Sequence, residues 1–396
     1  MARSEARHLV FFSDCPYYGG AEAYLALLAE ARPTPAWRLS ALVPAGPSGE
    51  VLAERLTAAD VRVVRYAVGG WVDPRFWRRL TRLLRELGGE VLHLNLPSVY
   101  DARLSVPAVL AKRSGYRRVV TTEHLPMVER ARRRMLAKIL ISTAIDAIIV
   151  HTDWNRERLA HYHHMPWRKM VVIPNGSAEP PAGGRGAREA LRGRLGLAEG
   201  NFAIAMVGRL TERKGHRFLL EALAQLKRDG SGAGWRLLVV GEGEEAGPLA
   251  ELARGLQIGE ETAFLGYRDD ACEIIGASDL LVLPSLMETQ PLVLTEAMAA
   301  GRPVIASAIY GIPEIVADGE TGCLVPAGEV APLAAAIERL VDDRSLARRL
   351  GEAGRRRYEE RFTLRQMAER TYAVLAGGCS DAVRAGERTA EATAER

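Results

Sequence analysis

The sequence predicts an α/β protein made of two doubly wound domains, each with a parallel sheet covered by helices. The chain of 396 residues is long enough for two separate hydrophobic cores. Short apolar segments alternate with longer segments of helical pattern along most of the chain, which is typical of parallel sheets with helical crossovers. The segment GSAEPPAGGRGARE, at residues 176–189, is rich in glycine, proline and charge and predicts a linker between two series of these segments.

The two series contain the predicted strands, and each short apolar strand is followed by a segment of helical pattern. They divide the chain into an N-terminal domain over 1–178 and a C-terminal domain over 179–357. The tail 378–396 lacks large apolar residues and is predicted to be disordered. The strands are expected near 8–13, 38–44, 61–67, 90–95, 117–124, 147–152 and 170–175, and then near 202–208, 236–243, 263–267, 280–285, 302–307 and 322–327.

Composition favours a globular protein of the cytoplasm. Hydrophobic residues make up 48% of the chain and charged residues 26%, which are ordinary values for such proteins. The first apolar stretch is too short for a signal peptide, and the longest apolar-rich run is interrupted by Lys138 and Asp146, so no membrane span is expected. The scattered cysteines show no metal-ligand spacing and are expected to be reduced thiols: Cys15, Cys272, Cys323 and Cys379.

Charge is distributed unevenly between the two halves. Residues 1–178 hold 26 Lys and Arg against 16 Asp and Glu, whereas the remainder holds 27 against 33, which gives the whole chain its net charge of +4. Two basic helical faces in the first half leave two readings open, contact with anionic lipid headgroups or a lipid-diphosphate acceptor, and an ordinary solvated face. Nucleic-acid binding is not predicted, because no aromatic residues are interleaved in a recognisable module. The two faces contain Arg75, Arg78 or Arg79, Arg82 and Arg85 beside Trp77, and Arg130, Arg134 and Lys138.

Two glycine-containing loops of the second half have features of phosphate sites. VVGEGEEA, at 239–246, formally fits a dinucleotide fingerprint, but its three glutamates would repel a pyrophosphate, so it is predicted to be a tight strand-to-helix turn. VGRLTERKG, at 207–215, places Arg209 and Lys214 where a strand ends and a helix begins, which suits a diphosphate. A solvated basic loop is the alternative.

ETQPLVLTE, at 288–296, carries a glutamate at each end. Pro291 is expected in the first turn of a helix, with Glu296 inside that helix and Glu288 on the loop before it. The carboxylates are then roughly 8 to 17 Å apart, mostly too far for the pair of a retaining glycosidase at about 5 Å. The helix N-terminus between them attracts phosphate, so one long ligand with a sugar at one end and a ribose at the other fits the span. Two solvated glutamates are the alternative.

These motifs resemble those of the retaining glycosyltransferases of family four, also called glycosyl transferases group 1. The E-x7-E signature of that family is met by Glu288 and Glu296, followed by AMAAGRPVIAS. GIPEIVADGETGCLVPAGE, VGRLTERKG, VVIPNG and the N-terminal YYGGAEAYLALLAE match in the expected order, and the resemblance covers roughly residues 8 to 375. It implies the GT-B fold, with two Rossmann-like domains facing a central cleft, and a final helix near 358–376 that packs back on the first domain.

The resemblance implies a role for individual residues. Arg209 and Lys214 match a diphosphate-binding pair, Glu296 a ribose-holding residue, and Glu288 the residue beside the donor sugar. Gly19 and Gly20 match a loop that approaches the diphosphate, and His124 matches a histidine that faces the sugar, although a buried histidine with satisfied contacts is an alternative reading. The usual Gly-Phe-Gly is replaced by Thr289, Gln290 and Pro291, which leaves the sugar open; Thr289, Gln290 and Leu292 are expected to adjoin the donor, and Thr289 to cap the helix.

The function implied is transfer of a sugar from a nucleotide-diphosphate sugar to a hydroxyl acceptor with retention of configuration. No D-x-D motif occurs in the chain, so no metal or cofactor is expected, and Arg209 and Lys214 would supply the positive charge instead. The N-terminal domain should bind the acceptor, lipid-linked or not, and the C-terminal domain the donor. The alternatives are an epimerase or phosphorylase of the same fold, or a non-catalytic subunit that binds a sugar nucleotide.

Overall fold

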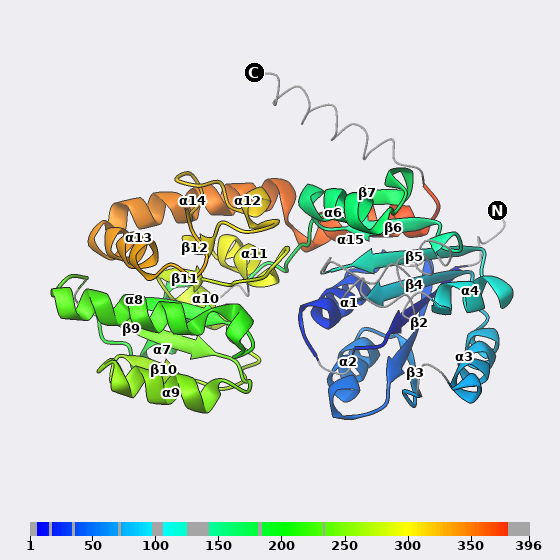
Figure 1. Cartoon of the computed structure of the whole chain (residues 1–396), viewed down its shortest axis with the longest axis horizontal. Coiled ribbons are helices and arrows are strands. Elements are labelled where there is room, and N and C mark those ends of the chain that lie inside the picture. The colour runs from blue at the N-terminus through cyan, green and yellow to red at the C-terminus, as the bar shows by residue number, and fades with distance from the viewer. Residues whose placement is uncertain are drawn as a thin grey trace, which may run out of the picture. The chain divides into compact units, whose positions relative to one another are not determined.

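The computed structural model describes residues 6–15, 18–33, 36–69, 73–96, 106–124, 142–180, 184–232 and 234–378. The chain divides into two compact units, one made of residues 1–175 and 364–396 and the other of 176–363 (Figure 1). The chain therefore passes from the first unit to the second a few residues before the boundary at 178 that the sequence suggested. It returns to the first unit a few residues after the suggested boundary at 357.

The first unit contains a parallel sheet with the strand order β3-β2-β1-β4-β5-β6-β7 in the described part of the chain. The order reverses between β1 and β4, as in a doubly wound sheet. Its strands are β1 (Arg7–Ser13), β2 (Trp37–Pro44), β3 (Arg62–Tyr66), β4 (Val91–Leu96), β5 (Arg118–Glu123), β6 (Ala147–Val150) and β7 (Met170–Val172). Its helices are α1 (Gly20–Glu30), α2 (Pro47–Ala58), α3 (Pro74–Leu87), α4 (Val106–Arg113), α6 (Asp153–His163), the 3-10 helix η2 (Trp167–Lys169) and α15 (Leu364–Leu375).

Both faces of the central strands of this sheet are buried, which explains why these strands are largely apolar. Along β1, Leu9 and Phe11 point to a core formed with α1, α2 and α15. Val10 and Phe12 point to the opposite core, formed with α3, α4 and α6. The alternation follows from the two-residue period of a strand.

The second unit contains a parallel sheet with the strand order β10-β9-β8-β11-β12-β13. The order reverses between β8 and β11, which pair directly, with Ile204 opposite Leu280. Its strands are β8 (Phe202–Val207), β9 (Trp235–Val240), β10 (Thr262–Phe264), β11 (Leu280–Leu283), β12 (Val304–Ser307) and β13 (Cys323–Val325). Its helices are α7 (Gly184–Arg194), η3 (Glu212–Lys214), α8 (His216–Asp229), α9 (Ala246–Gly255), α10 (Ala271–Ala277), α11 (Leu292–Ala299), α12 (Ile312–Ile315), α13 (Val330–Asp342) and α14 (Arg344–Arg361).

The C-terminal part of the chain returns to the first unit only at α15, which Figure 1 shows in orange-red among the elements of that unit. The Tyr372 hydroxyl donates to Leu28 O at 3.1 Å, and Arg118 Nε donates to Val374 O at 2.8 Å. The sequence suggested that this helix begins near residue 358, but residues 358–363 are not part of it. Tyr358 and Phe362 are buried in a core of the second unit, so the chain stays there until residue 363.

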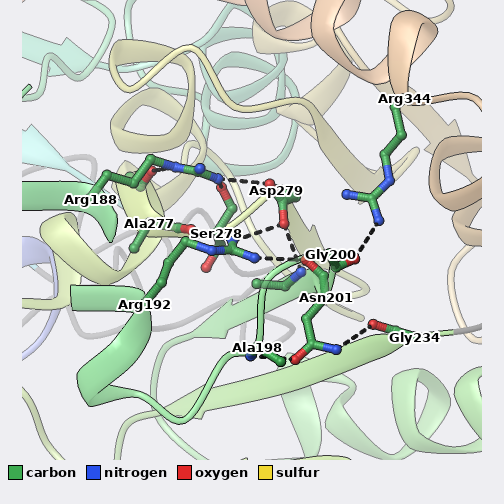
Figure 2. A network of polar contacts seen from close by, with 12 residues as sticks. Arg188, Arg192, Ala198, Gly200, Asn201, Gly234, Ala277, Ser278, Asp279 and Arg344 are labelled. Atoms are coloured by element: carbon green, nitrogen blue, oxygen red, sulfur yellow. Dashed lines mark hydrogen bonds and ion pairs between the residues drawn. The ribbon is translucent and has the colours of Figure 1, made fainter. Parts of the chain in front are cut away.

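The amino-terminal ends of β8 and β11 are joined by a network around Asp279, which directly precedes β11 (Figure 2). Arg188 Nη2 lies 2.7 Å from Asp279 Oδ1, and Arg192 Nη1 lies 3.0 Å from Asp279 Oδ2. The same Oδ2 accepts from Ala203 N at 2.9 Å, while Arg192 Nη2 donates to Asn201 O at 2.7 Å. Both arginines stand one turn apart on α7, so the network fixes α7 to the two central strands.

Candidate functional site

The two central strands of the second sheet also carry the loops that hold most of the predicted site residues. The loop after β8 spans 208–215, and the loop after β11 spans 284–291. Both leave the carboxyl ends of neighbouring strands at the point where the strand order reverses. Ligands of open α/β sheets bind at this point, because the connections after the two neighbouring strands run to opposite sides of the sheet and leave room between their loops.

Gly215 fixes the first loop against the second. Its φ of +74° is in the left-handed region, and a Cβ atom at this position would lie 2.0 Å from Pro284 O. Leu286 N donates to Arg213 O at 2.8 Å, which adds a backbone contact between the two loops. The loops therefore have a fixed register relative to each other, and so do the side chains they carry.

Lys214 and Glu288 form an ion pair across these loops. Lys214 Nζ lies 2.5 Å from Glu288 Oε1, and the side chains are only 13% and 10% exposed. Because both groups are largely removed from water, each is held in place mainly by the other. Two residues chosen from separate motifs of the sequence thus meet in one small site.

Arg209 lies at the start of the same loop, where it is far more accessible. Its Nη2 atom lies 3.6 Å from Glu244 Oε2, and its side chain is 47% exposed. The backbone beside it is paired with the turn after β9, since Leu210 N donates to Glu242 O at 2.8 Å and Glu245 N donates to Leu210 O at 3.0 Å. The segment VVGEGEEA is accordingly a tight turn that supports the cationic loop, as the sequence suggested.

The helix α11 begins one residue later than the sequence suggested. Its first residue is Leu292 and its N-cap is Pro291, whose side chain has no hydrogen-bond acceptor. The expected capping role of Thr289 is therefore wrong, because this residue lies two positions before the N-cap. Thr289 and Gln290 are instead buried beside Glu288, with 6% and 5% exposure.

Glu296 is the fifth residue of α11 and is partly exposed, as is Leu292 at the start of the helix. In the first turn of α11, Leu294 N donates to Pro291 O at 3.2 Å, and the amides of Leu292 and Val293 precede the regular helical hydrogen bonds, so this end carries a partial positive charge. The structure thus places the ion pair before this helix N-terminus and Glu296 one turn into the helix.

His216 is a further residue of the candidate site, which sequence reasoning missed. It follows Gly215 as the first residue of α8, it is 3% exposed, and neither ring nitrogen has a hydrogen-bond partner within the described residues. Burial, with a smaller contribution from the charge of Lys214, lowers the pKa of His216 to about 4. The imidazole is therefore neutral at pH 7. Nothing in the local sequence signals this, because the burial arises from neighbouring loops.

His124, the predicted histidine of the first unit, lies at the carboxyl ends of β4, β5 and β6. His124 follows β5, and its Nε2 atom lies 2.8 Å from Asn95 Oδ1 near the end of β4. Its Nδ1 atom lies 3.0 Å from Nε2 of His151, which follows β6. Asn95 Nδ2 donates to Ala21 O at 2.9 Å, which connects His124 to the start of α1. Neither Asn95 nor His151 was singled out from the sequence.

Gly19 and Gly20 form the start of α1. Gly19 is its N-cap with an extended backbone, φ −149°, and its N–H donates to Glu22 Oε2 at 3.1 Å. A Cβ atom on Gly20 would meet nothing within 4 Å, and one on Gly19 would meet only Glu22 Oε2 at 3.6 Å. The fold itself therefore does not require glycine at either position. Burial raises the pKa of Glu22.

The remaining predictions fall outside this group. On α3, all five arginines are exposed, while Trp77 is half-buried and packs edge-on against Phe76 with ring centroids 4.9 Å apart. Arg130, Arg134, Lys138 and Cys379 lie outside the described residues. Over the described ranges there is no group of histidine, cysteine and acidic side chains that could hold a metal ion, and no helix long and apolar enough to cross a membrane.

Known proteins share both halves of this architecture. The description "Glycosyltransferase Family 4" matches residues 18–177, and "Glycosyl transferases group 1" matches residues 187–357. D-inositol 3-phosphate glycosyltransferase of Nocardia farcinica is 34% identical over 226 residues, which cover 55% of this chain and 50% of that protein. Exopolysaccharide phosphotransferase SCO2592 of Streptomyces coelicolor is 30% identical over 380 residues, covering 86% and 38%. The aligned region thus spans about half or less of these relatives.

The fold agrees with these matches. The crystal structure of Anabaena Alr3699/HepE in complex with UDP superposes with a TM-score of 0.79 at 21% identity, covering 94% of this chain and all of that one. Both halves of the chain match the family in order, and both sheets have the doubly wound topology of the GT-B fold. The chain therefore belongs to the group 1 glycosyltransferases of family four.

Proposed function

We propose that this protein transfers a sugar from a nucleotide-diphosphate sugar to a hydroxyl acceptor with retention of configuration. The observation that carries the proposal is the Lys214–Glu288 ion pair, 2.5 Å between Nζ and Oε1, immediately before the N-terminus of α11. A buried cation paired with the loop that leads into this helix suits a phosphate, and a buried carboxylate at the same point suits the hydroxyls of a sugar.

The chemistry requires stabilisation of the leaving group. When the bond to the sugar breaks, negative charge develops on the departing diphosphate. Lys214, the exposed Arg209 and the first-turn amides of α11 are fixed donors for that charge. We propose that these groups make a divalent metal unnecessary. The departing phosphate would take the proton of the acceptor hydroxyl on the same face of the sugar, so no covalent intermediate with an enzyme nucleophile is assigned.

The second unit is assigned to the donor. Glu288 would contact the sugar, and Glu296 would accept hydrogen bonds from the ribose hydroxyls further along α11. Thr289, Gln290 and Leu292 would adjoin the sugar between them. Uridine diphosphate is the first choice of nucleotide, because the similar HepE protein was crystallised with UDP. In the first unit, Gly20 leaves open space at the start of α1, which would let the diphosphate approach.

The acceptor is assigned to the first unit, whose α3 exposes five arginines. A lipid-linked acceptor would bring this face close to anionic headgroups. Flotation of the full chain with vesicles of phosphatidylcholine, with and without phosphatidylglycerol, checks this assignment. Binding only to the anionic vesicles, lost on replacing Arg78 and Arg82 by glutamine, supports it; no binding to either vesicle contradicts it.

The test of the main proposal is a donor screen with purified protein. UDP-, GDP- and ADP-sugars are incubated with candidate hydroxyl acceptors and with native membranes, and nucleoside diphosphate release is measured with and without EDTA. Acceptor-dependent release that EDTA leaves unchanged is expected, with the anomeric configuration of the product retained by NMR. Binding without nucleoside diphosphate release would indicate a non-catalytic subunit, and interconversion of the sugar would indicate an epimerase. Loss of release in the presence of EDTA would refute metal independence.

A further inference from the structure

A continuous chain of polar contacts runs through the carboxyl ends of three strands in the first unit. It begins at Ile173 O, which lies 3.0 Å from His151 Nδ1. His151 Nε2 lies 3.0 Å from His124 Nδ1, and His124 Nε2 lies 2.8 Å from Asn95 Oδ1. Asn95 Nδ2 completes the chain with a 2.9 Å contact to Ala21 O. Each ring nitrogen of both histidines therefore has a partner at hydrogen-bond distance.

The two ends of this chain determine where two of the ring protons lie. A backbone carbonyl can only accept, so His151 Nδ1 must carry a hydrogen and donate it to Ile173 O. At the other end, Asn95 can donate to Ala21 O only through its amide nitrogen, which fixes the orientation of the side-chain amide. Its oxygen therefore faces His124, and His124 Nε2 must carry a hydrogen as well.

The contact in the middle then lacks a proton if both rings are neutral. A neutral imidazole carries one N–H, and in each ring that hydrogen is already used at the outer contact. His151 Nε2 and His124 Nδ1 would face each other as two lone pairs at 3.0 Å, which is repulsive. One additional proton between these two nitrogens turns the contact into a charge-assisted hydrogen bond.

We infer that His124 and His151 share one additional ring proton, so that the pair carries a single positive charge and His151 is the positioning residue for His124. The importance of this for catalysis rests on the proposed function, in which His124 faces the donor sugar. The pair would present positive charge towards an anionic ligand. Because its nitrogens are used by Asn95 and His151, the His124 ring would act by charge and position, not as a general base.

Burial opposes the charge, which makes the pair sensitive to its surroundings. Burial lowers the pKa of His151 to about 4, and burial together with the neighbouring His151 lowers that of His124 well below its usual value. Among the described residues, the other titratable groups packed against the pair are the Tyr24 ring, whose centroid lies 5.1 Å from that of His124, and His93, whose pKa burial lowers to about 3. The adjoining buried acid is Glu123, next to His124 in the chain.

The sign of the pH dependence follows directly. The shared proton is present below the pKa of the pair and is lost as the pH rises through it, which would separate the two rings or rotate one of them. An anionic ligand at His124 would stabilise the charged form and raise that pKa. Nucleotide binding should therefore be accompanied by proton uptake.

Two substitutions separate charge from position. In His151→Gln, the side-chain amide can donate to His124 Nδ1 and leave the ring in place without the additional proton. In His151→Leu, both the partner and the charge are removed. The glutamine variant should keep KM for the donor within about threefold while its kcat loses the wild-type dependence on pH. The leucine variant should lose at least about tenfold in kcat/KM, since the His124 ring is released.

The decisive measurement is independent of activity. The full chain is labelled with 15N in its histidine rings, and ring-nitrogen shifts are followed from about pH 5 to 9, with and without UDP. The series is extended down to about pH 3, because burial lowers the pKa of His151 to about 4. We expect the two rings to titrate together and to hold three N–H protons at the lower pH, with the step at higher pH when UDP is bound. Independent titration, or two neutral rings throughout, would overturn the inference. If no UDP binds but the rings share the proton, the proposed donor is wrong and the inference stands.

Discussion

The two ends of the second sheet use the same pairing of basic and acidic side chains in different ways. At the amino ends of β8 and β11, Asp279 accepts from Arg188, from Arg192 and from a backbone amide, so both of its oxygens are used. At the carboxyl ends of the same strands, Lys214 and Glu288 contact each other beside a helix N-terminus. The first arrangement is closed within the protein, whereas we propose that the second exchanges partners with the donor.

Under the proposed function, the amino ends of these strands contribute mainly to stability and the carboxyl ends mainly to catalysis. The arginines of α7 hold the amino ends of the central strands. At the carboxyl ends, the close approach of Gly215 to Pro284 O holds the two loops together by backbone contact. Substitutions at the amino ends should therefore change the free energy of unfolding, and substitutions at the carboxyl ends should change turnover and ligand affinity. Four substitutions test this division.

The largest effect is expected for Lys214→Ala, which removes the cation nearest the proposed diphosphate. We expect kcat/KM to fall about 100-fold or more, because a fixed charge at the leaving group acts mainly on the transition state. The measurement is steady-state nucleoside diphosphate release. Arg217→Ala, two residues after Gly215 in an exposed pair with Glu221, is the matched control and should keep the wild-type rate. A Lys214 variant as active as the control would contradict the site assignment.

Asp279→Ala should have the next largest effect, on stability and not on catalysis. Removing the carboxylate leaves two partly buried guanidinium groups without their anion, which should cost about 2 kcal/mol of the free energy of unfolding. Urea denaturation measures the loss, and hydrogen exchange should locate it in β8 and β11. The control is Glu251→Ala, from an exposed pair with Arg254. A loss of donor affinity at unchanged stability would break the proposed division.

Glu296→Ala should weaken nucleotide binding about tenfold, which corresponds to about 1.4 kcal/mol, because the carboxylate would lose its hydrogen bonds to the ribose. Isothermal titration with UDP measures the change. A 2′,3′-dideoxy nucleotide should bind the variant and the wild type equally, since it lacks the hydroxyls in question. Should the variant still prefer UDP over the dideoxy nucleotide, Glu296 does not hold the ribose.

The smallest effect is expected for Arg344→Ala at the periphery of the Asp279 network. Arg344 donates to Gly200 O at 3.1 Å and lies 4.5 Å above the Phe202 ring, so it stabilises the start of β8 only from outside. The free energy of unfolding should fall by about 0.5 to 1 kcal/mol in the same urea titration, without a change in KM. A loss of unfolding free energy equal to that of Asp279→Ala would mean that Asp279 is not more important to the network than its peripheral contacts.

The sequence predicted the strands well and two helix boundaries poorly. Each predicted strand segment overlaps one of the strands β1 to β13, because the strands are largely apolar and alternate with helical segments. The break between α14 and α15 was missed, since no glycine or proline marks it. It depends on the burial of Tyr358 and Phe362 in the second unit, which is a tertiary effect. Pro291 was likewise placed inside the helix, whereas it forms the N-cap.

The site was predictable to the level of motifs and not of contacts. Arg209, Lys214 and Glu288 were found because each lies in a loop after a predicted strand. That Lys214 touches Glu288 depends on β8 pairing with β11, which are separated by β9 and β10 in the sequence. Asn95 and His151 were missed for the same reason, since their meeting with His124 requires the order β4-β5-β6.

The two points at which the chain passes between the units also influence the order in which the units can fold during synthesis. Ser177 and Thr363 lie beside each other in a parallel bridge, and Ser177 N donates to Phe362 O at 3.1 Å. The second unit thus begins and ends at one place, as an insertion within the first. On the ribosome, residues 176–363 are complete before α15 has emerged, while the first unit still lacks the helix that covers Leu28 and Trp37. The part encoded second is therefore the part that can finish folding first.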